Sequence, residues 1–369
     1  MDQAEVLQAG LSAGMSAVSG FHSSKPNWVD ASLAGKNIIP LDEVPTAKSR
    51  VLFLSATKPV SASPLCIGAW PWGDTPTWHW SDDEWPAVQA AWKVLYEAGI
   101  NFIDTAQAYG SGKGEKLVGE AVRGLPRDSF VIQTKWLSTA TKLTNFIHPV
   151  DAPVKCLKES LERLGLDYVD IYLVHGPIHP QSIHHAAEGM AKCVHDGLAR
   201  AVGVANYSKE DMLKFADELK KYNVPLAVNQ CEFSVLRRLP ELSGNIAAAR
   251  ERGIVFQSYS SLGQGRLTGK YNKENPPPKT YRFSSYPMEE LEPVLAVLRR
   301  IGERHGKSMA SVALNYNISK GVVPLVGIRN EKQARDAVEA LGWRLSIEDM
   351  VAIDKVSIEG KTTKLWQQG

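Results

Sequence analysis

Short apolar segments alternate with amphipathic segments of helical periodicity along most of this chain. The apolar segments fit buried strands, and the amphipathic segments fit helices packed against them. A succession of strand, helix and strand predicts a parallel sheet, because parallel strands need a long crossover between them. The expected strands occupy residues 65–70, 100–104, 130–135, 169–175, 201–206, 226–230, 254–259 and 322–326. Eight strand–helix units predict a closed α/β barrel, the (β/α)8 or TIM barrel.

The helices expected around these strands complete the pattern. They span residues 83–98, 114–123, 153–164, 182–196, 208–221, 241–252, 289–304, 308–318, 331–340 and 346–356. An open doubly wound sheet is the alternative, and its dinucleotide-binding form needs a Gly-x-Gly-x-x-Gly turn after an early strand. The glycines at 110, 112 and 114 lack that spacing and follow the second strand. The barrel is therefore the better prediction.

The chain is expected to divide into an extension at residues 1–49 and a barrel domain at residues 50–369. A short hairpin made of residues 51–54 and 58–60 precedes the first barrel strand. The extension has scattered Gly, Ser and Pro, which predicts low structural content, with a helix over residues 3–18 as the alternative. It lacks the pattern of a secretory signal, and no arginine comes before Arg50. We expect a cytoplasmic protein, with an organellar presequence as the lesser alternative.

Composition argues against several classes of protein. The net charge is only +2 and there is no long basic run, which argues against a nucleic-acid binder. No apolar run is long enough to span a membrane. The four cysteines, Cys66, Cys156, Cys193 and Cys231, are far apart and lack the spacing of a disulfide framework or a zinc site. No metal is therefore expected.

Polar residues stand at the ends of several predicted strands. Asp104 ends the second strand, and Tyr109 follows five residues later. Lys135, His175 and Gln230 end three later strands. Each residue alone has an ordinary explanation, as a helix cap or a packed side chain. In a parallel barrel, however, reactive side chains lie at the strand C-termini, and buried polar groups there must find partners. The set therefore predicts one shared site.

Six segments together resemble the aldo-keto reductases over residues 50–358. They are Asp104-Thr105-Ala106…Tyr109-Gly110, Thr134-Lys135, Leu173-Val174-His175, Gly203-Val204-Ala205-Asn206-Tyr207-Ser208, Asn229-Gln230-Cys231-Glu232 and Gly327-Ile328-Arg329…Gln333, in family order. The resemblance implies NADPH-dependent reduction of an aldehyde or ketone to an alcohol. A hydride then reaches the carbonyl carbon, and a proton reaches the carbonyl oxygen.

The resemblance also implies the catalytic roles. Tyr109 would donate the proton. A free phenol has a pKa of about 10, and we expect the neighbouring Lys135 ammonium to lower that value. Asp104 would pair with Lys135, and His175 would orient the substrate carbonyl. A histidine at 175 implies ordinary carbonyl reduction, because relatives that reduce steroid carbon–carbon double bonds carry glutamate there.

The cofactor contacts implied by the resemblance lie after several strands. Asn206 and Gln230 match the residues that hold the nicotinamide carboxamide, and Tyr259 matches the aromatic residue that stacks on the ring. Arg329 suits the 2′-phosphate of NADPH, and Gln333 matches a contact to the adenosine end. The remaining expected cofactor contacts are Gly68, Ala69, Trp70, Asp104, Ser260, Leu262, Gly265 and Gly327.

Tryptophans crowd the loop after the first strand, at positions 70, 72, 78, 80 and 85. Packing explains any one of them, but so many around a polar loop suggest an aromatic wall. Trp70 and Trp136 are the tryptophans expected to contact the substrate, together with Tyr109 and His175. An aromatic wall suggests a flat or aromatic carbonyl compound, such as an aryl aldehyde, a pyridoxal-like ring or a polyketide ketone.

Two other functions remain open at this point. A cofactor-binding regulatory subunit resembling the potassium-channel β subunits would share the fold, and turnover would distinguish it from an enzyme. A barrel enzyme that uses Lys135 for Schiff-base chemistry would need no nicotinamide. The pairing of Asp104 with Tyr109, together with Arg329 at the eighth strand, argues against the latter. A monomer or a dimer is the expected assembly.

Overall fold

Eight parallel strands close into a barrel in this computed structural model, which describes residues 37–138, 147–278, 286–363 and 366–369. The strand order around the barrel is β10-β3-β4-β5-β6-β7-β8-β9. The strands are β3 (Cys66–Gly68), β4 (Phe102–Asp104), β5 (Val131–Trp136), β6 (Val169–Val174), β7 (Ala199–Ala205), β8 (Leu226–Glu232), β9 (Val255–Tyr259) and β10 (Val323–Gly327). The predicted (β/α)8 barrel is confirmed.

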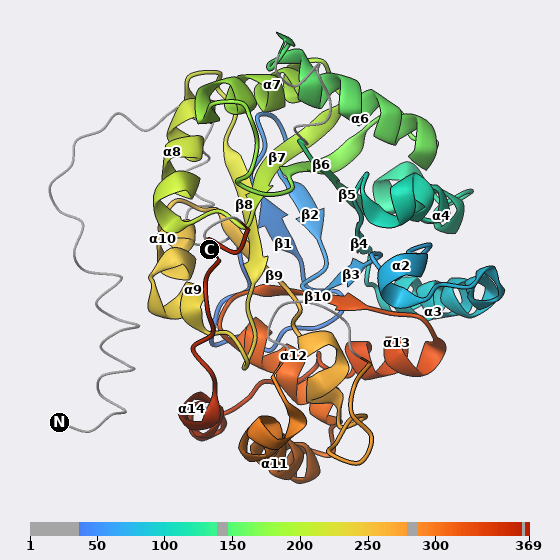
Figure 1. Ribbon diagram of the computed structural model, residues 1–369, viewed down its shortest axis with the longest axis vertical. Coiled ribbons are helices and arrows are strands. Elements are labelled where there is room, and N and C mark those ends of the chain that lie inside the picture. The colour runs from blue at the N-terminus through green and yellow to red at the C-terminus, as the bar shows by residue number, and fades with distance from the viewer. Residues whose placement is uncertain (1–36, 139–146, 279–285, 364–365) are drawn as a thin grey trace, which may run out of the picture.

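Helices form a ring around the strands (Figure 1). They are α2 (Thr75–Trp78), α3 (Trp85–Ala98), α4 (Lys113–Ala121), α6 (Asp151–Leu164), α7 (Ile183–His195), α8 (Lys209–Lys220), α9 (Leu239–Leu242), α10 (Asn245–Glu251), α11 (Met288–His305), α12 (Met309–Ser319), α13 (Glu331–Val338) and α14 (Ile347–Val356). The helix expected over residues 241–252 is divided into α9 and α10, because Gly244 adopts a left-handed conformation with φ 77°. The short helix α2 was not predicted.

Local sequence explains where the helices begin and end. The side chains of Ser182, Ser208 and Ser308 each accept a backbone hydrogen bond from the first turn of their helix, as N-caps do. Gly99 and Gly165 end α3 and α6 in the left-handed conformation, which costs glycine little. The apolar faces of these helices pack on the outer surface of the barrel and form the larger core.

A two-stranded hairpin closes one end of the barrel. It consists of β1 (Val51–Phe53) and β2 (Val60–Ala62), as the sequence predicted. The ring of Phe53 packs edge-on against that of Phe102 with centroids 5.5 Å apart. The hairpin thereby joins a second core inside the barrel, built from side chains near the starts of the strands. The other end of the barrel, where the strands finish, stays available for a site.

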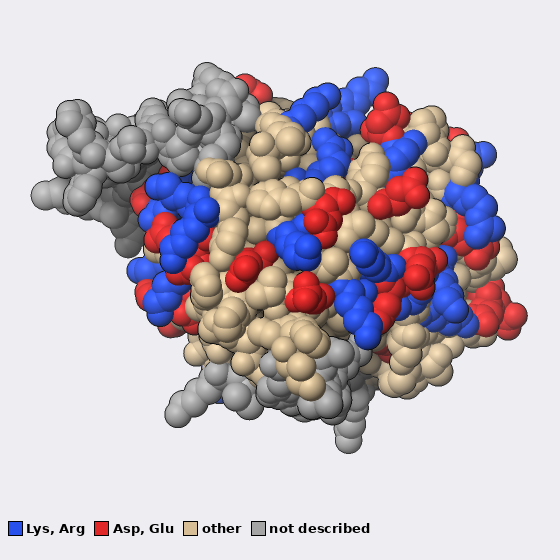
Figure 2. Space-filling view, turned by 90° about the horizontal axis from the view of Figure 1, so that it is seen from above, with Lys and Arg blue, Asp and Glu red and all other residues tan. Residues whose placement is uncertain are grey.

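Residues 37–49 contain no helix or strand but are bound to the barrel. The Asn37 side chain donates to the carbonyl of Gly253 (2.7 Å), and Gly342 donates to the carbonyl of Pro45 (2.7 Å). The helix considered over residues 3–18 lies outside the described residues. No helix in the described ranges is long and apolar enough to cross a membrane. Lys and Arg are interspersed with Asp and Glu on the face in Figure 2, with no continuous basic patch among the residues described there.

Candidate active site

The register of the barrel brings the predicted polar residues to one level. Gly68 of β3 pairs with Asp104 of β4, and Asp104 pairs in turn with Gln133 of β5. On the other side of the barrel, Gln230 of β8 pairs with Gln257 of β9. Because all these strands are parallel, their final residues project into the same mouth of the barrel.

Three of the predicted catalytic side chains form a continuous chain of contacts. Lys135 Nζ donates to Asp104 Oδ2 at 2.5 Å and lies 3.1 Å from Tyr109 Oη. Lys135 is fully buried, and Asp104 nearly so. Tyr109 begins a short 3-10 turn (Tyr109–Gly112) in which Gly110 has φ 54°. A Cβ on Gly110 would collide with the carbonyl oxygen of Gly73, so the backbone that presents Tyr109 requires glycine at this position.

The pKa of Tyr109 is raised above its ordinary value, contrary to our expectation from the sequence. Removing the phenol from water disfavours the phenolate, and this outweighs the opposing effect of Lys135. Burial also disfavours the Lys135 ammonium, but Asp104 and Tyr109 hold the pKa of Lys135 above its usual value. The site therefore contains a protonated phenol beside a protonated amine. A buried ammonium has no free lone pair, which argues against Schiff-base chemistry at Lys135.

A layer of three amides lies beneath Asp104. Gln133 Nε2 and Gln230 Nε2 donate to Asp104 Oδ1, at 2.6 and 3.1 Å. The same two nitrogens donate to Gln257 Oε1, at 3.0 and 3.1 Å. We refer to Gln133, Gln230 and Gln257 as the amide layer. Together with Lys135, it supplies the donors that a buried carboxylate needs.

Aromatic rings surround Tyr109. Trp70 stacks on it with centroids 5.8 Å apart, and His175 meets it edge-on at 5.7 Å. Trp78 packs edge-on against Trp70 at 5.6 Å. Trp366, distant in sequence, packs against His175 at 5.6 Å. Phenol, imidazole and indole rings thus surround one hydroxyl group. Of the five tryptophans expected to form an aromatic wall, only Trp70 and Trp78 line the cavity, whereas Trp72 and Trp80 are buried in the core.

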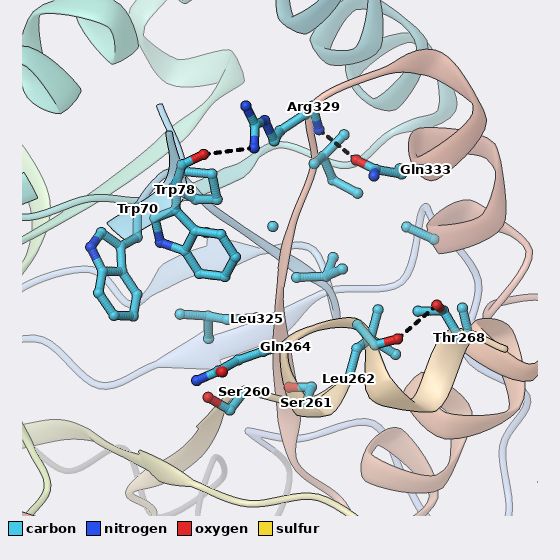
Figure 3. A pocket seen from close by; sticks show the side chains of 18 of the residues that line it. Trp70, Trp78, Ser260, Ser261, Leu262, Gln264, Thr268, Leu325, Arg329 and Gln333 are labelled. Atoms are coloured by element: carbon cyan, nitrogen blue, oxygen red, sulfur yellow. Dashed lines mark hydrogen bonds between the residues drawn. The ribbon is translucent and has the colours of Figure 1, made fainter. Parts of the chain in front are cut away.

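A cavity of about 940 Å³ runs from Tyr109 and Asp104 to Arg329. Figure 3 shows Trp70 and Trp78 on one side of it, Ser260, Ser261, Leu262 and Gln264 on another, and Arg329 with Gln333 at one end. The predicted cofactor contacts that line it are Gly68, Trp70, Asp104, Gln230, Tyr259, Ser260, Leu262, Gly265, Gly327, Arg329 and Gln333. Its size lies within the ~300–1,000 Å³ usual for ligand pockets.

The donors along this cavity suit an anionic dinucleotide. The loop over Ser260–Gly265 turns sharply, with left-handed residues at Ser260, Gln264 and Gly265. Arg329, Lys332 and the N-terminus of α13 lie at the far end. Backbone N–H groups and cations of this kind bind phosphates. The residues present therefore fit a nicotinamide dinucleotide, whose phosphates the loop, Arg329 and Lys332 would hold.

Several predicted residues lie beside the cavity without lining it. Ala69 and Asn206 are buried; Asn206 accepts a hydrogen bond from the Tyr259 hydroxyl (2.7 Å) and donates to the carbonyl of His175 (3.2 Å). Trp136 is fully buried and stacks against His179 at 6.4 Å. The structure thus places the predicted substrate contact Trp136 behind the wall of the cavity.

The last described residues, 366–369, contribute contacts near the site that were not predicted. Gln367 Nε2 donates to the Glu232 carboxylate, and Arg237 Nη2 donates to the backbone oxygen of Gly369 at 2.6 Å. Figure 1 shows this segment beside β8, at the mouth of the barrel. No periodicity marks the segment, and its partners lie more than a hundred residues away along the chain, so no local pattern pointed to it.

His179 was given no role from the sequence, but it is half-buried near the site. Its ring nitrogens lie 2.7 Å from Tyr207 Oη and 2.7 Å from the carbonyl oxygen of Gln181. Burial lowers the pKa of His179. The imidazole is stacked between Trp136 and Tyr207, with centroids 6.4 Å from each ring. His179 therefore packs against Trp136, behind the wall of the cavity.

Comparison with known proteins agrees with the fold. Residues 64–358 match the model of the Aldo/keto reductase family. The chain is 33% identical to the chloroplastic pyridoxal reductase of Arabidopsis thaliana over 319 residues, 82% of this chain and 85% of the relative. It is 29% identical to the NADH-specific methylglyoxal reductase of Escherichia coli, over 79% of this chain and 94% of the relative. A structure of a Bombyx mori aldo-keto reductase in complex with NADP superimposes with a TM-score of 0.61 at 26% identity, over 80% of this chain and 89% of that chain.

Proposed function

The chain belongs to the aldo-keto reductase family, and on this premise we propose that it uses NADPH to reduce an aldehyde carried on an aromatic ring. The observation that carries the proposal is the contact of Lys135 Nζ with both Asp104 (2.5 Å) and Tyr109 (3.1 Å) at one end of the long cavity. The stacked Trp70 and the edge-on His175 favour a flat ring beside the reactive carbonyl. The name of the Arabidopsis relative, a pyridoxal reductase, agrees with this choice of substrate.

The reaction needs a proton at the carbonyl oxygen, and Tyr109 supplies it. When bound, the nicotinamide provides the hydride. The raised pKa of Tyr109 keeps the phenol protonated at neutral pH, and Lys135 stabilises the phenolate that remains after transfer. Asp104 fixes Lys135 in place. The ring of His175 packs edge-on against that of Tyr109, and from there it orients the carbonyl by hydrogen bonding.

The test compares Tyr109→Phe with a matched substitution, Tyr96→Phe. Tyr96 lies on α3, donates to Ser129 Oγ (2.7 Å) and is not among the residues that line the cavity. NADPH oxidation is measured with pyridoxal, benzaldehyde and an aliphatic aldehyde of similar mass. Loss of general acid catalysis should lower the rate about 10²–10⁴-fold in Tyr109→Phe, while NADPH binding followed by fluorescence stays unchanged. Tyr96→Phe should retain the unsubstituted rate.

Each other outcome points to a different conclusion. NADPH binding without turnover of any aldehyde would favour a regulatory subunit over an enzyme. Faster reduction of the aliphatic aldehyde would refute the aromatic substrate class but not the reductase. Full activity in Tyr109→Phe would refute the assigned proton donor. The expected cytoplasmic location stays a prediction, and the name of the Arabidopsis relative adds the chloroplast as the alternative.

A further inference from the structure

We propose that Glu84 determines how strongly this enzyme discriminates between NADPH and NADH, because its carboxylate binds the guanidinium that a 2′-phosphate would need. The inference rests on the proposed function and names a residue that the sequence analysis did not include. Glu84 lies just before α3, and Arg329 follows β10, so 245 residues separate them. The barrel brings them together at the end of the cavity far from Tyr109.

The contact between Glu84 and Arg329 is bidentate. Arg329 Nε donates to Glu84 Oε2 at 2.6 Å, and Nη2 donates to Oε1. Nη1 donates to the carbonyl oxygen of Trp78 at 3.1 Å, a bond drawn in Figure 3. The side chains of Arg329 and Glu84 are only 27% and 28% exposed, so water screens the pair less than an ordinary surface pair. All three guanidinium nitrogens are thus already engaged by protein oxygens.

Glu84 is held in this position by its own local structure. Its Oε1 accepts a hydrogen bond from the backbone N–H of Ser81 at 3.2 Å, within a capping box that starts the turn over Asp82–Glu84. Burial disfavours the charge, but the hydrogen bonds from Arg329 and Ser81 lower the pKa of Glu84 overall. The carboxylate is therefore ionised at neutral pH and fixed beside Arg329.

The neighbouring cation also has an acidic partner. Lys332 lies on the first turn of α13, and its Nζ is 2.8 Å from Asp336 Oδ2. Both residues line the cavity. The formal charges of Arg329, Glu84, Lys332 and Asp336 therefore sum to zero. A phosphate monoester at this place adds about −1.5 to −2 charges at neutral pH. It must displace Glu84 from Arg329 or lie beside that carboxylate, and like charges at close range repel. The ribose hydroxyl of NADH meets neither obstacle.

The decisive variant is Glu84→Gln. Glutamine keeps the length of the side chain and its acceptor oxygen, and it also forms capping boxes, so the turn before α3 is preserved while the charge is lost. The dissociation constants of NADPH and NADH are measured by fluorescence titration. Releasing one charge-assisted contact of Arg329 should strengthen NADPH binding about tenfold, which corresponds to about 1.4 kcal/mol. NADH binding should change less than about twofold, because it brings no phosphate to Arg329.

Glu331→Gln is the matched control. Glu331 lies on the first turn of the same helix α13, but it pairs with Arg335 and does not line the cavity. It removes the same charge from the same region, so a general electrostatic effect would appear in both variants, whereas a direct effect on Arg329 appears only in Glu84→Gln. The ratio of the two dissociation constants should therefore stay unchanged in Glu331→Gln.

Three outcomes would overturn the inference. An equal change for NADPH and NADH in Glu84→Gln would show that Glu84 does not discriminate between them. Weaker NADPH binding would show that Glu84 orients Arg329 for the phosphate instead of competing with it. If the unsubstituted protein bound neither coenzyme, the proposed function would fail as well, and this result is distinct from binding with an unchanged ratio.

Discussion

Replacing Asp104 by asparagine should destabilise the barrel by removing the counter-charge of a buried ammonium. In the structure, Asp104 Oδ2 accepts from Lys135, while Oδ1 accepts from Gln133 and Gln230. An asparagine oxygen can keep the two amide bonds, so the change is confined to the Lys135 contact. There the new amide nitrogen would face Lys135 Nζ, and two donors cannot bind each other.

The expected magnitude follows from burial. The Lys135 side chain is 0% exposed and that of Asp104 is 3% exposed. Removing one partner of such a pair costs about 3–5 kcal/mol of unfolding free energy, because the remaining charge stays buried without compensation. For a urea m-value of about 3 kcal/mol/M, this lowers the unfolding midpoint by about 1 M or more.

The matched control is Asp217→Asn on α8. Asp217 pairs with Arg252 at 3.0 Å, but the two side chains are 60% and 50% exposed. Exposed ion pairs contribute at most about 1 kcal/mol to the free energy of unfolding, so the urea midpoint of Asp217→Asn should move little. Urea unfolding is followed by tryptophan fluorescence at pH 7 for both variants and the unsubstituted protein. Equal midpoints for Asp104→Asn and Asp217→Asn would refute the argument from burial.

The pH dependence gives a second check on the same variant. In the unsubstituted protein the pKa of Lys135 is raised, so its stabilisation is complete below the unfolded pKa of about 10.4. This stabilisation is lost only as the pH rises through the pKa of Lys135 in the folded protein. Lys135 therefore adds no pH dependence to the free energy of unfolding between pH 7 and 9.5. Asp104→Asn removes the negative charge that raises the pKa of Lys135, so burial, which lowers this pKa, is opposed only by the weaker contact with Tyr109. The stability deficit should therefore shrink as pH rises to 9.5, and a deficit independent of pH would contradict this account.

Two further predictions concern Tyr109 and the cysteines. The pKa of Tyr109 is raised above 10.0, so kcat/KM for aldehyde reduction should not fall through deprotonation of this phenol until the pH exceeds 10. A fall of kcat/KM centred near pH 8 that disappears in Lys135→Met would contradict the raised pKa of Tyr109. All four cysteines are buried, and burial raises the pKa of Cys231 to about 12. A maleimide at pH 8 should therefore label the protein only after denaturation, as measured by mass spectrometry. Stoichiometric labelling of the native protein would show instead that a thiol is accessible.

Much of the barrel was predictable because its sequence signals are local. A run such as Phe130–Lys135 is apolar enough to mark a buried strand, and Ser208 marks the start of α8 by a cap within one turn. The division between α9 and α10 was missed because apolar periodicity continues through Gly244, and only its backbone angle shows the break. Strand order and closure followed from the number of repeated units.

The candidate site was predictable only in part. Asp104, Tyr109 and Lys135 could be grouped because each lies at or just after a strand end. The predicted direction of the pKa shift of Tyr109 was wrong. The sequence indicated the neighbouring charge of Lys135, but the desolvation of Tyr109 depends on packing by many segments and could not be estimated from it. Glu84 and Trp366 were not assigned, since their partners Arg329 and His175 are 245 and 191 residues away along the chain.

The amide layer has a consequence for how this barrel can change over evolutionary time. Buried polar groups of this kind are seldom the most stable way to fill a core, and apolar replacements of similar shape often fold more tightly. Here the same amides hold the carboxylate that holds Lys135. Selection for heat tolerance cannot improve that level of the barrel without disturbing the reactive phenol. Stabilising substitutions are therefore expected in the core between the strands and the helices. The buried polar residues at the centre of the barrel should be retained for as long as the reaction is needed.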